Sequence, residues 1–145
     1  LPIAFSRPIC YTNAVPLEYL STFWHGSLAI WKHHEKDGKR MTPAEIYTSG
    51  AGHFMAAEQF EKAGITLVDN TPQEIADVVL EMAAGASKEP QAAFWHAFPR
   101  GLSLYNNAPL HGEICMRIGR QFLEEVCANT DREREPGRPR VAALP

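Results

Sequence analysis

Short apolar runs along this chain alternate with stretches of helical periodicity, and this order predicts an α/β domain. Residues 9–12 and Ser27–Trp31 are apolar runs bounded by polar or turn-forming residues, so each predicts a buried strand. Ile65–Val68 predicts a third strand, placed between Gly64 and the start of a helix. The succession of helix end, strand, tight loop and helix is typical of parallel strands with helices packed on them. We therefore expect a small parallel sheet flanked by helices.

Two helix starts carry the signature of a capping box. Thr42 and Thr71 each precede a proline and stand three residues before Glu45 or Glu74. Each threonine can accept from the amide three residues on, while the glutamate reaches back to the threonine amide. Apolar residues at i, i+3, i+4 and i+7 follow the second start, and this stripe predicts a face buried against the sheet that contains residues 65–68. The stripe consists of Ile75, Val78, Val79 and Met82.

Two further helices are expected. One precedes Gly64, where Phe54, Ala57 and Phe60 have helical spacing. The other covers residues 111–129, with apolar residues four apart and Gly119 as its weak point. Beyond it, alternating charges and three prolines predict a disordered tail. The expected organisation is an α/β domain of residues 1–129 and a tail of residues 130–145.

Charge and cysteine content narrow the expected partners. The chain has 145 residues, and its 14 Lys and Arg against 17 Asp and Glu give a net charge of -3, which argues against general nucleic-acid binding. The absence of an apolar run of about 18 residues predicts no membrane span and, by default, a cytoplasmic protein. Three widely spaced cysteines without a C-x-x-C pair predict free thiols, with neither a disulfide framework nor a zinc site. They are Cys10, Cys115 and Cys127.

Several motifs suggest chemistry, but a simpler interpretation is favoured for each. His33 and His34 lack the spacing that would bring two metal ligands together, so we interpret them as solvated loop histidines and expect no metal. Residues 49–52 could present amides to a phosphate, but they lack the Lys-Ser/Thr of a P-loop, which favours a turn between helices. The aromatic cluster at residues 94–98 is interpreted as core packing. A G-x-S-x-G motif is absent, which argues against a nucleophilic hydrolase.

Asn13 and Lys32 are stronger candidates for a binding site. Each stands at the carboxyl end of a predicted strand, the side on which open α/β sheets bind ligands. A turn-forming asparagine and a solvated lysine remain the alternative on spacing alone.

Four segments, read in order, carry a resemblance. They are L-P-I-A-F-S-R-P-I-C-Y-T-N at residues 1–13, S-L-A-I-W-K at 27–32, G-I, N-T-P-Q-E-I and E-M within 64–82, and R-I-G-R-Q-F-L at 117–123. Together they resemble a bacterial glycosyltransferase-like family of surface-polysaccharide gene clusters. Members of that family look like GT-B enzymes, with two Rossmann-like lobes and a nucleotide-sugar donor held mainly by the C-terminal lobe. The resemblance implies that this chain corresponds to the C-terminal part of such an enzyme, a partial Rossmann-like lobe.

The resemblance also implies where a donor would bind. It places Thr12, Asn13 and Lys32 beside the donor crevice, with no obligatory metal or other cofactor, although Trp31 stands where the family usually has a smaller residue. A Gly- and Ser-containing turn precedes Leu1 in the family, so binding of a nucleotide-sugar by this chain is expected to be weak or lost. No catalytic base is assigned.

A second class of function stays open. A non-enzymatic interaction domain derived from the same fold would use its uncovered apolar surface to bind a partner or a second copy, as a homo-oligomer. The start at Leu1 without methionine is interpreted as a processed chain or a piece of a longer protein.

Overall fold

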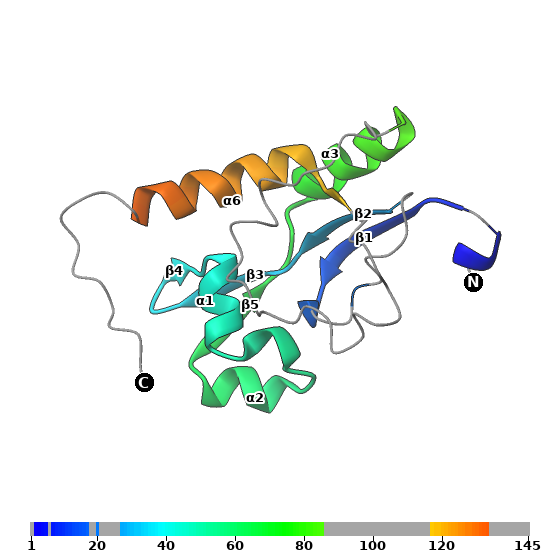
Figure 1. Cartoon of the computed structure of the whole chain (residues 1–145). Coiled ribbons are helices and arrows are strands. Elements are labelled where there is room, and N and C mark those ends of the chain that lie inside the picture. The colour runs from blue at the N-terminus through cyan, green and yellow to red at the C-terminus, as the bar shows by residue number, and fades with distance from the viewer. Residues whose placement is uncertain (1, 6, 18–19, 21–26, 86–116, 134–145) are drawn as a thin grey trace.

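The computed structural model describes residues 2–5, 7–17, 20, 27–85 and 117–133 (Figure 1). Within them, the helices and strands form a mixed α/β domain that contains a three-stranded parallel sheet and a three-stranded antiparallel sheet. The expected fold class, a small parallel sheet flanked by helices, is confirmed, and the arrangement is consistent with a partial Rossmann-like lobe.

The parallel sheet has the order β1-β2-β6. Its strands are β1 (Ile9–Ala14), β2 (Ser27–Trp31) and β6 (Arg117–Ile118). All of β2 is buried, because this strand is central, pairs in parallel with both neighbours and lies under helices. Its uninterrupted apolar run therefore identified the centre of the sheet correctly.

The antiparallel sheet has the order β4-β3-β5 and begins one residue after β2. Its strands are β3 (His33–Lys36), β4 (Lys39–Arg40) and β5 (Ile65–Val68). The strand at residues 65–68 thus exists, but the expectation that it joins the parallel sheet is wrong. Asp37 and Gly38, with φ of 53° and 71°, form the two-residue turn of the β3–β4 hairpin. Asp-Gly is a strong sequence signal for such a turn.

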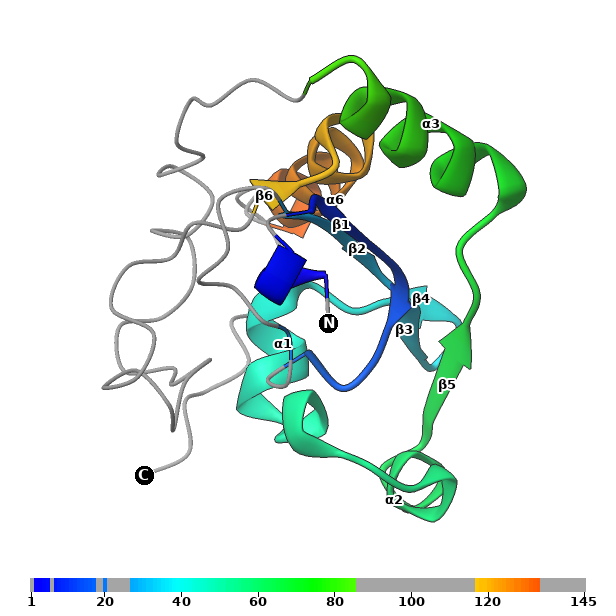
Figure 2. The ribbon, with the colours of Figure 1, turned by 90° about the vertical axis from the view of Figure 1, so that its right-hand side faces the viewer.

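The helices lie on two sides of the molecule (Figures 1 and 2). On one side, α3 (Pro72–Ala83) packs against β1, β2 and α6 (Arg120–Glu133). On the other side lie α1 (Pro43–Thr48) and α2 (Ala57–Lys62), and α2 packs against β5. Single 3-10 turns occur at η1 (Ile3–Phe5) and η3 (Ala51–His53).

Both predicted capping boxes are confirmed. Thr42 and Thr71 donate their backbone N–H groups to Glu45 Oε2 at 2.7 Å and to Glu74 Oε2 at 2.6 Å. In return, each threonine Oγ1 accepts from the glutamate amide, at 3.3 Å and 3.2 Å. The signal is reliable because it depends only on residues within four positions of one another.

The buried face of α3 is narrower than the apolar stripe predicted. Val78 is 2% exposed, and Ile75 and Met82 pack partly buried against the core. Val79, by contrast, is 48% exposed, so its expected burial is wrong. The helix contacts the parallel sheet and α6 rather than β5, and these partners cover only one narrow strip of its surface.

The last helix begins later than predicted, because a strand precedes it. Ile118 lies fully buried in β6, and Gly119 leads into α6. A Cβ on Gly119 would lie 3.0 Å from Val78 Cγ2 and 3.1 Å from Ile30 Cγ2, so the glycine permits close packing at the strand–helix junction. Helix α6 continues to Glu133, past the expected domain boundary at residue 129. Residues 111–116 and 134–145 lie outside the described part of the chain.

Candidate functional site

The carboxyl ends of β1 and β2 form one edge of the parallel sheet, which we call the carboxyl edge. Tyr11 pairs with Ala29 and Ala14 with Trp31, so two residues of β1, Thr12 and Asn13, stand opposite one residue of β2. This is a β-bulge, and its second residue, Asn13, has a φ of 52°. Asparagine tolerates this left-handed conformation better than most residues.

An interlocked pair of asparagines holds the carboxyl edge. The Asn13 amide donates to Asn70 Oδ1 at 2.7 Å, and the Asn70 amide donates to Asn13 Oδ1 at 2.6 Å. Asn70 Nδ2 also donates to the carbonyl oxygen of Trp31 at 2.8 Å, and Asn70 is only 5% exposed. Asn70 stands two residues after the end of β5, so the hydrogen-bonded pair of Asn13 and Asn70, which we call the clasp, ties the antiparallel sheet to both β1 and β2.

Lys32 lies beside this clasp, in the single residue between β2 and β3. Its amide donates to the carbonyl oxygen of Ala14 at 3.4 Å. Its Nζ lies 2.6 Å from Asp69 Oδ1, and the two side chains are 28% and 68% exposed. An ion pair this exposed contributes little to stability and exchanges partners easily.

The structure therefore brings the three predicted residues, Thr12, Asn13 and Lys32, to one edge. It adds Asp69 and Asn70, which sequence reasoning missed. Their signal was present, because both follow a predicted strand and precede a helix cap, where polar residues often reach a ligand. The end of β5 reaches the carboxyl edge from the antiparallel sheet.

The chemistry available at this edge is the binding of an anion. Lys32 offers an ammonium group whose partner, Asp69, can be displaced into solvent, and Thr12 is half-buried on the adjacent strand. The side-chain oxygen of Asn13 is already engaged with Asn70, so Asn13 shapes the backbone of the edge rather than offering a free amide.

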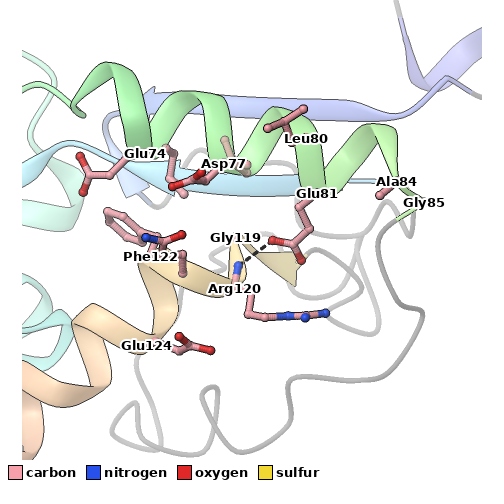
Figure 3. Close-up of a pocket in the computed structure, with 13 residues that line it drawn as sticks. Glu74, Asp77, Leu80, Glu81, Ala84, Gly85, Gly119, Arg120, Phe122 and Glu124 are labelled. Carbon is pink, nitrogen blue, oxygen red and sulfur yellow. Dashed lines mark hydrogen bonds between the residues drawn. The ribbon is translucent and has the colours of Figure 1, made fainter.

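A groove of about 730 Å³ lies between α3 and α6 (Figure 3). Ile30, Val78 and Phe122 contribute apolar lining, and most of its charged side chains are acidic. Figure 3 shows the Glu81 side chain directed at the start of α6, where its Oε2 accepts from the Arg120 amide at 2.7 Å.

The carboxylates that α3 contributes to this groove have structural partners. Glu81 Oε1 lies 3.5 Å from Arg117 Nη2, and both side chains are largely buried. Asp77 Oδ1 accepts from Gln73 Nε2 at 2.7 Å. Glu74 Oε1 lies 2.8 Å from His33 Nε2. Each of the three carboxylates that α3 contributes is therefore held by another protein group.

His33 and His34 are not solvated loop residues, contrary to expectation. They lie in β3 and are 6% and 2% exposed, because β3 is the central strand of its sheet and α6 and α2 contribute Phe122 and Phe60 beside the rings. Burial raises the pKa of Glu74, but hydrogen bonds from Thr71 and the attraction of His33 outweigh it, and the net effect lowers that pKa. Glu74 thus stays charged beside His33.

Two further sequence interpretations concern the turn at residues 49–52 and the cysteines. Residues 49–52 form the expected turn, with Ser49 ending α1 and Gly50 at a φ of 78°. Cys10 is a free thiol whose pKa is raised by burial and by the charge of Glu81, so it is not an activated nucleophile. Cys115 and the cluster at residues 94–98 lie outside the described residues.

Among the described residues, no three His, Cys, Asp or Glu side chains are grouped as metal ligands would be. None of the helices in the same residues is long and apolar enough to cross a membrane.

Comparisons of the chain with protein-family models, with curated proteins and with solved structures gave no significant match.

Proposed function

We propose that this domain is a glycosyltransferase-like lobe whose carboxyl edge contributes part of a nucleotide-sugar donor site. The observation that carries the proposal is the parallel pairing of β1 and β2, which sets Asn13 beside Lys32 at the side where open α/β sheets bind ligands. Lys32 supplies a cation for a diphosphate, and its exposed pair with Asp69 can open. A cytoplasmic location, expected from the sequence, is part of this proposal.

Binding at this edge is expected to be weak. A donor diphosphate needs several amides or cations, whereas Lys32 is one ammonium with a competing carboxylate at 2.6 Å. The glycine-containing turn that the resemblance implies upstream of Leu1 would supply further donors. We therefore expect a millimolar Kd, about -4 kcal/mol, and no detectable turnover by this chain.

A chemical-shift titration of the chain with uridine and guanosine diphosphates tests the proposal. We expect perturbations at residues 12–16 and Lys32 that disappear in Lys32→Ala. Lys39→Ala is the matched control, because it removes an exposed lysine from the β3–β4 hairpin and leaves the carboxyl edge intact. Shifts centred on residues 50–53, or shifts unchanged in Lys32→Ala, would refute the assignment of the donor site.

The exposed apolar surface of α3 favours self-association as a second candidate function. Val79 and Leu80 are adjacent on this helix and are 48% and 65% exposed. Sedimentation of the chain across a range of concentrations would reveal an oligomer, which Leu80→Lys should dissociate. Met55→Lys, at a residue 68% exposed near α2, is the control. A monomer at every concentration would remove this candidate.

A further inference from the structure

His34 is a buried histidine with one ring nitrogen satisfied and the other without a partner. Its Nδ1 lies 2.9 Å from the carbonyl oxygen of Lys32. Because a carbonyl oxygen only accepts, Nδ1 must carry the ring proton. Nε2 is then a bare acceptor, and no group of the described residues lies within hydrogen-bond distance of it. The ring packs against Phe60 of α2, with centroids 5.8 Å apart.

A proton on Nε2 would place a charged N–H group in this buried position, with no acceptor among the described residues. A buried charge without a partner is strongly disfavoured, so uptake of the proton favours exposure of the ring. The charged groups around it offer little compensation. His33 is adjacent on β3, Arg40 of β4 lines the same small cavity, and Glu125 of α6 is paired with Arg40 at 3.7 Å. Burial lowers the pKa of His34, the Lys32 carbonyl opposes this, and His33 adds to it.

His33, the next residue on β3, differs from His34 because its Nε2 has a partner. That Nε2 lies 2.8 Å from Glu74 Oε1, and the two side chains are 5% and 10% exposed. Among the described residues, by contrast, no carboxylate lies within hydrogen-bond distance of His34 Nε2.

We propose that His34 is an acid sensor that loosens the antiparallel sheet from α2 when Nε2 takes up a proton. His34 is placed to transmit this change, since it pairs with Leu67 of β5 and its carbonyl oxygen accepts from the Met41 amide at 2.7 Å. Its ring also holds the carbonyl of Lys32, the residue that joins the two sheets. This inference does not depend on the proposed donor site.

The sign of the effect follows from linkage. The folded state binds fewer protons at His34 than the unfolded state, so stability is present above the unfolded pKa of about 6.5 and is lost as pH falls below it. For one such group, the folding equilibrium constant falls about tenfold between pH 7.5 and pH 5.5. Glu74 stays charged in this window because its pKa is lowered.

Urea denaturation of the full chain at pH 7.5 and pH 5.5 tests the inference. Glutamine can still donate to the Lys32 carbonyl but does not titrate, so His34→Gln should remove about a tenfold pH effect. His53→Gln, at an exposed histidine, should leave that effect in place. An unchanged pH effect in His34→Gln would overturn the inference.

Two measurements on the unmodified chain guard against a variant that fails to fold. Imidazole ¹⁵N shifts should show His34 neutral, with the proton on Nδ1, in the folded state at pH 5.5. Hydrogen-exchange protection at pH 5.5 should fall for the amides of β3 and β5 and persist for those of β1 and β2. Ordinary titration of His34 near pH 6.5 with protection unchanged would contradict the proposal.

Discussion

The carboxyl edge and the groove between α3 and α6 are both polar, but their polar groups are used differently. In the groove, Glu74, Asp77 and Glu81 of α3 each contact a protein group at a helix end or on a neighbouring element. At the carboxyl edge, the hydrogen bonds of the clasp between Asn13 and Asn70 join the two sheets. The Lys32–Asp69 ion pair at the same edge is more exposed, at 28% and 68%.

The difference lies in how firmly each region holds its polar groups. Replacing the protein contacts of the groove carboxylates by ligand contacts would leave helix ends and buried groups unpaired. Opening the Lys32–Asp69 pair costs little, because water solvates both partners. A rigid backbone carrying one exchangeable charge is therefore the better candidate.

The largest expected effect concerns the floor of the groove. Val78→Asp should cost about 4 kcal/mol or more of unfolding free energy, because it buries an unpaired carboxylate at a position 2% exposed. Val79→Asp, which the apolar stripe alone would predict to be as damaging, should change stability by about 0.5 kcal/mol or less. Urea denaturation of both variants measures this. Equal losses would show that α3 is rotated from the position described.

The next effect concerns the clasp at the carboxyl edge. Asn70→Ala should cost about 2–3 kcal/mol, because it removes two side-chain hydrogen bonds, from Asn70 Oδ1 to the Asn13 amide and from Asn70 Nδ2 to the Trp31 carbonyl. Asn13→Gly should cost about 1 kcal/mol, since it loses one acceptor but relieves the positive φ. Thermal or urea denaturation gives both values. A larger loss for Asn13→Gly would show that the clasp depends on Asn13 instead.

The smallest expected effect on the unfolding free energy comes from removing one charge in each region. Glu81→Gln should cost about 1–2 kcal/mol, because it removes a largely buried charge from Arg117 and from the start of α6. Lys32→Ala should change stability by about 0.5 kcal/mol or less, since its ion pair is exposed. The unfolding free energies of the two variants, measured side by side, check this. A costly Lys32→Ala would mean that Lys32 is structural and would weaken its assignment to a ligand.

Prediction from sequence succeeded where the signal is local. The capping boxes at Thr42 and Thr71 and the buried run Ser27–Trp31 depend on residues a few positions apart, and all three are present as expected. The candidate residues Asn13 and Lys32 were located by the same kind of evidence, the point at which a strand ends.

Tertiary structure decided the rest. The sequence by itself determined that residues 65–68 are a strand and that α3 has apolar positions, but the partner of that strand and the covered face of the helix depend on residues far along the chain. The burial of His33 and His34 and the arrival of Asp69 and Asn70 at the carboxyl edge follow from that same pairing of β5 with β3. Sheet pairing is chosen by long-range packing, and propensity at the strand itself does not encode it.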